Sequence, residues 1–442
     1  MRPGRPTERT GGPRPAGAVD VVVIGAGHAG LAASHFLNRR GIDHVVLERG
    51  EIANTWRTER WDSLRLLTPN WQSRLPGFAY EGEDPDGFMT MPEVVDFIDR
   101  YAAHCGAPVI THSPVESVEA AGAGYRVVTP RGTWRCRAVV LATGAFNRPV
   151  VPAVAERLPA NIGQLTPHGY RNAQQLAPGG VLVVGASATG LQLAHEIRRA
   201  GHEVTLAVGE HVRMPRSYRG QDIQHWLHVT GILDEGLDDV DDAERARNLP
   251  SPQLLGAASP RILDLNALTA RGVRLVGRLV GVNGGKAQFS GGLRNVCALA
   301  DLKMERLLRR IDEWIGEAAP GPFAALHGAP EDYGATVVPE HPDLVLDLAQ
   351  REIRTVIWAT GFRPDYSWLH VDALDRKGRL RHHGGVVDAP GLYALGLPML
   401  RRRKSSFIHG IEDDARDVTA HLAVFLRAGA RAPAPAAGRR AA

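Results

Sequence analysis

The feature that most constrains this chain is a strand, a glycine-rich turn, a helix and a second strand, which follow one another in that order and occur twice. The first copy starts with the apolar run DVVVI, continues with GAGHAG at residues 25–30, and ends with HVVLE at residues 44–48. Gly25 permits the tight turn, Gly27 lets the backbone approach a phosphate, and Gly30 lets the helix pack closely on the strand. The helix then presents free N–H groups and partial positive charge to that phosphate.

An acidic residue completes the first copy. Glu48 ends the second strand 18 residues after Gly30, where a carboxylate accepts hydrogen bonds from the ribose hydroxyls of an adenosine. A glycine turn alone is common, but the strand, turn with Ala26, helix, strand and acid together favour nucleotide binding over a structural turn. We therefore expect FAD to bind this first copy.

The second copy has the run VLVV, the turn GASATG and a strand that ends at Val208. Gly185, Ser187 and Gly190 take the three glycine positions, and two dinucleotide sites imply two nucleotides. Val208 stands where Glu48 stands in the first copy. No carboxylate would therefore repel a ribose 2′-phosphate at the second site.

Basic residues follow the second copy closely. Arg213, Arg216 and Arg219 can each form a charge-assisted pair with a phosphate. The sequence thus favours NADPH over NADH, with Arg213 and Arg216 as the expected 2′-phosphate contacts. The alternative is that these arginines only cover a surface loop.

Two further apolar runs resemble one another and bracket the second copy. AVVLATG ends at Thr143 and Gly144, and TVIWATG ends at Thr360 and Gly361. Small residues at such strand ends suit chain passages beside a cofactor. A last strand, GLYALG, ends at Gly396 and is expected to return to the first domain.

These motifs predict an α/β fold with two Rossmann-like dinucleotide-binding domains, the NAD(P)-binding domain being inserted into the FAD-binding domain. The predicted parts are residues 19–175 and 338–428 for the FAD domain, and residues 176–337 for the NAD(P)H domain with a helical insertion. Residues 1–18 and 429–442 are expected to be disordered tails.

Charge separates the tails from the body. The formal net charge is +4, but the first 18 residues carry +3 and residues 427–442 carry +4, so the remaining body carries −3. A slightly acidic body argues against nucleic acid as a partner, although basic tails could bind an acidic one. No apolar stretch reaches the length of a membrane span, and no apolar leader precedes the first strand. A cytoplasmic location without membrane contact is the expectation; the oligomeric state stays open.

The spacing of the cysteines and histidines does not indicate a further cofactor. Cys105, Cys136 and Cys297 never form a CxxC pair, which argues against a disulfide scaffold, a cysteine zinc site and a redox dithiol. His225 and His228 lack a carboxylate or cysteine partner at metal-ligand spacing, so no metal site is expected.

The order of these motifs, together with TWR at residues 55–57, resembles the class B flavin-dependent monooxygenases over nearly all of residues 19–425. That family includes FMO-type, N-hydroxylating and Baeyer–Villiger enzymes, and the stretches SLRLLTP, LPGF, YRN and RGQD are most similar to its soluble bacterial branch. The resemblance implies that NADPH reduces FAD and that O2 forms a C4a-hydroperoxyflavin. Oxygen then passes to a nitrogen, sulfur or carbonyl group of a small organic substrate.

The resemblance also implies site residues. Trp56 and Arg57 would lie near the flavin, although a core tryptophan beside a surface arginine would give the same pattern. In the family fingerprint, Phe-x-Gly-x-x-x-His-x-x-x-Tyr or Trp, only Tyr170 is in place. Thr166 takes the histidine position and His168 lies two residues later, so the coupling of NADPH oxidation to oxygen transfer depends on these residues.

Two other functions remain open. One is an NAD(P)H-dependent flavin oxidase or reductase that inserts no oxygen, which Thr166 favours. The other is a non-catalytic FAD-binding accessory protein. The number of H2O2 molecules released per NADPH consumed would separate these classes.

Overall fold

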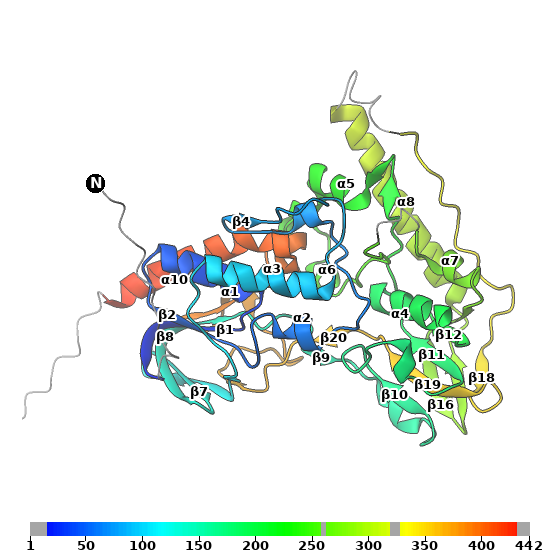
Figure 1. Cartoon of the computed structure of the whole chain (residues 1–442), viewed down its shortest axis with the longest axis horizontal. Helices are drawn as coiled ribbons and strands as arrows, with labels where there is room; N and C mark the ends of the chain where they lie inside the picture. Colours follow the sequence, from blue (N-terminus) through cyan, green and yellow to red (C-terminus); the bar gives the residue numbers. More distant parts are fainter. Residues whose placement is uncertain (1–15, 258–261, 319–327, 431–442) are drawn as a thin grey trace, which may run out of the picture.

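A computed structural model describes residues 16–257, 262–318 and 328–430, which form two α/β bodies side by side (Figure 1). The predicted disordered tails fall almost entirely on residues 1–15 and 431–442, outside the described residues. The first strand, β1, begins at Ala18, and the last helix, α10, ends at Ala430.

The first body is built on a sheet of ten strands among the described residues, with the order β21-β6-β7-β8-β1-β2-β5. The long strand β8 pairs with β7 through its first half and with β24 through its second half, and β23 and β22 extend the sheet beyond β24. In chain order the strands are β1 (Ala18–Ile24), β2 (His44–Leu47), β5 (Val109–Ile110), β6 (Ser117–Ala121), β7 (Gly124–Thr129), β8 (Gly132–Leu141), β21 (Leu369–His370), β22 (His382–His383), β23 (Val386–Val387) and β24 (Leu392–Ala394).

Helices cover this sheet. The side chains of Val21, Val22 and Val23 in β1 are fully buried, because parallel β1, β2 and β8 are packed on both faces. In Figure 1 the three long helices of this body lie together above β1 and β2, and β7, a strand of the same sheet, lies below them. The helices are α1 (His28–Arg39), α2 (Asn54–Thr58), α3 (Met91–His104) and α10 (Ile411–Ala430).

The second body is built on a parallel sheet with the order β10-β19-β11-β12-β15. Apolar side chains of β11, β12 and α4 fill the core beneath it. The strands are β10 (Gly163–Leu165), β11 (Gly180–Val184), β12 (Val204–Ala207), β15 (Arg274–Val276) and β19 (Ile353–Trp358), and the helices that follow β11 and precede β15 are α4 (Ala188–Arg199) and α7 (Leu265–Thr269).

The expected boundaries of the inserted domain, 176–337, are too narrow. The residues of β10 and β19 fall within the two predicted parts of the FAD domain, 19–175 and 338–428, but both strands hydrogen-bond within the second sheet. The apolar run of β19 shows that this strand is buried, whereas β10, with the sequence GQL, is largely exposed and has no such run. Neither pattern shows which sheet the strand joins, because long-range pairing decides that.

The helical insertion follows β12. Its longest element is α8, which runs diagonally across the second body in Figure 1. The helices are α5 (Ile223–Val229), α6 (Ala243–Arg247) and α8 (Leu293–Ala318). Short strands accompany them as β13 (Ser217–Tyr218), β14 (Gln221–Asp222), β16 (Leu279–Asn283), β17 (Lys286–Phe289) and β18 (Val345–Asp347).

Two neighbouring chain segments join the bodies. Strand β9 (Arg148–Pro149) leads out of the first body and pairs antiparallel with β20 (Phe362–Arg363), which leads back. The Val150 N–H donates to the Gly361 carbonyl at 2.9 Å, and the Thr360 hydroxyl donates to the Val150 carbonyl. The predicted insertion of one domain into the other thus takes place through one hydrogen-bonded pair of strands.

One small hairpin lies in the first body, β3 (Arg74–Leu75) with β4 (Phe78–Ala79). Across the described ranges, no helix combines the length and apolar character needed to cross a bilayer.

Candidate functional site

The first glycine turn is closed on the protein side and open on the other. Gly25 has φ +107°, and a Cβ there would lie 2.5 Å from the Ala142 carbonyl oxygen. A Cβ on Gly30 would lie 1.9 Å from the Gly25 carbonyl oxygen, so strand and helix require glycine at both positions. A Cβ on Gly27 would meet no heavy atom within 4 Å among the described residues. That open side, at the start of α1, is where a pyrophosphate fits.

Glu48 lies beside this turn. Its carboxylate accepts the Ala26 N–H at 2.7 Å and the Gly50 N–H at 3.2 Å, and only 7% of the residue is exposed. A carboxylate offers about four lone-pair positions, so two backbone bonds fix its orientation and leave acceptor capacity for ribose hydroxyls. These residues fit the adenosine end of FAD.

The remaining predicted residues of the first site border the same turn. Gly144 follows β8 with φ +77°, and the Thr143 carbonyl accepts the Asn147 amide at 2.8 Å. Gly396 has φ +75°, and a Cβ there would lie 2.9 Å from that of Ala29, so the loop after β24 passes directly against α1.

His28 belongs to this site although sequence reasoning did not select it. Burial lowers the pKa of its imidazole to about 4, and a backbone hydrogen bond with Ser406 acts in the opposite direction. The contact brings the segment before α10 to the start of α1. The sequence signal for this site residue was the histidine itself, which directly follows the second glycine of the turn, where a smaller residue would be sufficient to start the helix.

The second glycine turn has the same geometry as the first. Gly185 has φ +108°, and a Cβ there would lie 2.2 Å from the Ala359 carbonyl oxygen. A Cβ on Gly190 would lie 1.8 Å from the Gly185 carbonyl oxygen. Ser187 takes the position that corresponds to Gly27 and precedes α4. The Thr360 and Gly361 turn thus supports the second glycine turn in the way that Thr143 and Gly144 support the first.

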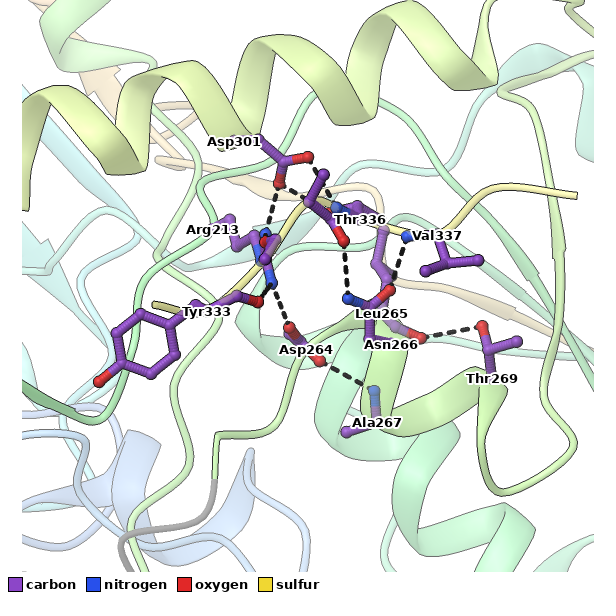
Figure 2. Close-up of polar contacts among 12 residues, drawn as sticks. Arg213, Asp264, Leu265, Asn266, Ala267, Thr269, Asp301, Tyr333, Thr336 and Val337 are labelled. Carbon is purple, nitrogen blue, oxygen red and sulfur yellow. Dashed lines mark hydrogen bonds and ion pairs between the residues drawn. The ribbon is translucent and has the colours of Figure 1, made fainter. Parts of the chain in front are cut away.

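Arg213 does not lie free beside the second site. Its guanidinium is 2% exposed and pairs with Asp264 at 2.8 Å and with Asp301 at 2.7 Å (Figure 2). The same terminal nitrogens also donate to the carbonyl groups of Tyr333 and Gly334. No donor of these nitrogens is left for a phosphate, so the expected 2′-phosphate contact is not supported.

Arg216 is also engaged within the chain. It pairs with Asp222 through two nitrogens, donates to the Leu67 carbonyl at 2.8 Å and lies 4.5 Å from the Phe88 ring centroid. Arg219 pairs with Asp312 at 2.7 Å. These arginines neither coat a surface loop nor face the nucleotide; they connect the helical insertion to its surroundings.

Arg278 is the better candidate for the 2′-phosphate. It follows β15, the neighbour of β12, and its side chain is exposed. Its Cγ and Cδ atoms lie 3.9 Å from the position of a Cβ on Gly209, two residues beyond β12. The ribose of a dinucleotide lies at the end of this second strand. Within the described part of the chain Arg278 forms no ion pair. Because Arg278 follows a different strand, β15, the sequence around the second glycine turn did not point to it.

The segment with the altered fingerprint lies at the contact between the two bodies. The Tyr170 hydroxyl is buried and donates to Glu196 at 2.7 Å; burial and this carboxylate raise the pKa of Tyr170, so it stays protonated. The Asp62 N–H donates to the Arg171 carbonyl at 2.9 Å. The Thr166 carbonyl accepts the Tyr170 N–H at 3.0 Å and closes the local turn.

His168 faces the first body. Its ring stacks on Phe362 with a centroid distance of 5.0 Å, and its Nε2 lies 3.8 Å from Glu59 Oε2. Neither of these buried atoms has a hydrogen-bond partner among the described residues. Burial lowers the pKa of His168, with Glu59 acting in the opposite direction and Arg60 in the same direction. The neutral ring is therefore favoured.

Trp56 and Arg57 lie on α2. Arg57 pairs with Asp99 of α3 and donates to the Ile52 carbonyl at 2.8 Å, so it connects two helices of the first body. Trp56 packs partly buried on the first core and carries Arg60 5.3 Å from its ring centroid. Arg60 and Glu59 extend from there toward His168.

Known proteins resemble this chain in sequence. A family model described as pyridine nucleotide-disulphide oxidoreductase matches residues 22–230. An uncharacterized CzcO-like oxidoreductase of Geobacillus kaustophilus is 32% identical over 400 residues, which cover 90% of this chain and 96% of that protein. The indole-3-pyruvate monooxygenase YUCCA6 of Arabidopsis thaliana is 29% identical over 297 residues, 62% of this chain and 69% of that protein.

The fold is also shared with solved structures. A flavin-containing monooxygenase from Stenotrophomonas maltophilia superposes with a TM-score of 0.64 at 23% identity, over 92% of this chain and 99% of that one. The fold with two α/β bodies is therefore shared with that structure over nearly all of this chain.

Proposed function

Because the chain belongs to the family of the CzcO-like oxidoreductases, we propose that it is an FAD-dependent, NADPH-consuming monooxygenase that oxygenates a small organic substrate with O2. The observation that carries the proposal is the pair of glycine turns with the same backbone geometry, one of which has Glu48 beside it. Flavin and nicotinamide dinucleotides are the two ligands that such a pair accommodates.

The bound flavin would supply the redox chemistry and the activation of O2, and the chain would supply binding, orientation and exclusion of water. The open side at Gly27 and the carboxylate of Glu48 would hold FAD. The start of α4 and Arg278 would hold NADPH. Tyr170, protonated and bound to Glu196, would fix the fingerprint segment against α4 of the second body.

A flavin oxidase that inserts no oxygen is the second candidate, and Thr166 favours it. A threonine hydroxyl can form a hydrogen bond, but it cannot take up a proton near neutral pH as an imidazole can. His168 lies nearby but faces Glu59 and stacks on Phe362. Less control of water at the site would release H2O2 instead of oxygenated product.

The test uses the purified protein. The cofactor released on denaturation should be FAD, and Glu48→Ala should retain less of it while the far-ultraviolet spectrum stays unchanged. NADPH, O2 and H2O2 are then followed with a thioether, a tertiary amine and a cyclic ketone as probes. A monooxygenase forms an oxygenated product and releases less H2O2 per NADPH with one of these probes than without. Release of FMN, or no oxidation of NADPH, would refute the proposal; one H2O2 per NADPH with every probe would establish the oxidase.

A further inference from the structure

The second glycine turn differs from the first in what lies against it. Residues 250–256, which we call the strap, run across the start of α4. The Ala188 N–H, the first of that helix, donates to the Ser251 carbonyl at 3.3 Å. In the first turn the equivalent residue is His28, and no backbone carbonyl among the described residues accepts its N–H.

Side chains hold the strap in this place. Gln253 is 1% exposed and donates its amide to the Ala186 carbonyl, inside the glycine turn, at 2.7 Å. Gln192 of α4 donates to the Leu254 carbonyl at 2.6 Å. The Gln253 N–H donates to the Val212 carbonyl at 2.8 Å. The strap is thus bound to the turn itself, to the helix and to the segment after β12.

The far end of the strap reaches the first body. Gly256 is packed so closely there that an added Cβ would lie 2.1 Å from the Leu66 carbonyl oxygen and 2.8 Å from the Arg65 Cβ. The strap therefore extends from the nucleotide turn of one body to the backbone of the other.

A carbonyl on Ala188 N–H takes the donor that a pyrophosphate needs at a dinucleotide turn. One N–H cannot serve a carbonyl and a phosphate oxygen at once, and the two oxygens repel. The closed arrangement also contains a defect, because Gln253 Oε1 is buried without a hydrogen-bond partner among the described residues. A buried acceptor without a partner destabilises the state that contains it, so this arrangement can be left.

We propose that the strap is a built-in gate of the second dinucleotide site, which must leave the start of α4 before the pyrophosphate of NADP(H) binds. The gate rests on the proposed function, since it presumes a nicotinamide nucleotide at that turn. Contact with Leu66 makes nucleotide entry depend on the surface that the first body presents. The apparent affinity for NADP+ is then reduced by the fraction of molecules in which the strap is closed.

The experiment opens the strap by substitution in the FAD-loaded protein. Gly256→Ala places a methyl group against the Leu66 carbonyl and cannot keep the closed contact. Gln192→Ala removes the bond to Leu254 more gently and serves if the first variant does not fold. Gly291→Ala is the matched control, because its Cβ would have its nearest neighbour, a Leu344 methyl group, at 3.9 Å. Titration calorimetry with NADP+ should give an apparent Kd about five-fold lower in the open variants and unchanged in the control.

Hydrogen–deuterium exchange supplies the second measurement. Adding NADP+ to the wild-type protein should increase exchange in the strap, where the Gln253 N–H is bonded in the closed form. Bound NADP+ with an equally or better protected strap would overturn the gate and leave the proposed function standing. NADP+ that opens the strap while NADPH fails to reduce the flavin would support the gate and count against the proposed function.

Discussion

The exposed guanidinium of Arg278 lies beside Gly209, from where it can contact a ribose 2′-phosphate. Arg278 forms no ion pair among the described residues, whereas Arg213 and Arg216 are bound to carboxylates. A buried charge that is already paired with a carboxylate contributes nothing to the binding of a ligand. We therefore expect Arg278, and not the paired arginines closer in sequence to the second glycine turn, to determine a preference for NADPH.

The first prediction is that Arg278→Ala lowers the preference for NADPH over NADH by about 10-fold, the effect of one charge-assisted contact of about 1.5 kcal/mol. The measurement is kcat/KM for both nucleotides. Arg274→Ala is the matched control, because that exposed arginine on β15 pairs with Asp343. An unchanged NADPH to NADH ratio in Arg278→Ala would assign the 2′-phosphate to another group.

Individual residues show what sequence can and cannot predict. The glycine turns and Glu48 were predictable, because each glycine answers a local steric requirement that the motif itself contains. The partners of Arg213 were not, since Asp264 and Asp301 come from elements 51 and 88 residues away. Arg278 escaped prediction for the same reason: its neighbour Gly209 lies across a strand pair.

At the scale of elements, the buried ion pairs of Arg213 connect α7, α8 and the segment at residues 333–337. Asp264 also caps α7 by accepting the Ala267 N–H at 2.8 Å, and Asp301 accepts the N–H and hydroxyl of Thr336 (Figure 2). One guanidinium thus compensates two carboxylates that would be costly to bury alone.

We expect Arg213→Met to destabilise the second body by about 3–5 kcal/mol, because both aspartates stay buried without their cation. The measurement is urea unfolding, with Arg219→Met as control. The control should lose about 1 kcal/mol or less, since the carboxylate of its partner Asp312 is 35% exposed. The NADPH to NADH ratio should not change in Arg213→Met. A stable Arg213→Met variant with an altered NADPH to NADH ratio would show that Arg213 contacts the nucleotide after all.

The order of elements was also predictable only in part. The resemblance to class B flavin monooxygenases, drawn from the order of the motifs, is confirmed by the relatives and the shared fold. The places of β10 and β19 were not predictable, because the short run GQL of β10 has no strand pattern and the apolar run of β19 fits either sheet.

At the scale of the whole molecule, a buried histidine contributes to the response to acid. Burial and the nearby Lys404 and Arg74 lower the pKa of His409 to about 3; His228 acts in the same direction and Asp234 opposes it. Below the ordinary pKa of about 6.5 the unfolded chain takes up a proton that the folded chain does not. The free energy of unfolding therefore falls as the pH drops from about 6.5 toward 3.

His409→Gln should remove part of this dependence. Between pH 6.5 and 5.0 the wild-type protein should lose about 1.6 kcal/mol more stability than the variant, because the histidine of the unfolded chain is half protonated at pH 6.5 and almost fully protonated at pH 5.0. Urea unfolding at the two pH values measures the difference, with the exposed His370→Gln as control. Equal losses in the wild-type protein and His409→Gln would mean that His409 is protonated in the folded protein.

The insertion of one domain into another has a consequence during synthesis on the ribosome. Strand β8 ends at Leu141, but β24, which pairs with it, ends only at Ala394, after every strand of the second sheet. At a synthesis rate of about 5–20 residues per second, the nascent chain carries that unpaired strand edge for roughly 10–50 s. The inserted domain therefore completes its sheet first. Any pause in translation within it prolongs the exposure of an apolar edge that can pair with other chains.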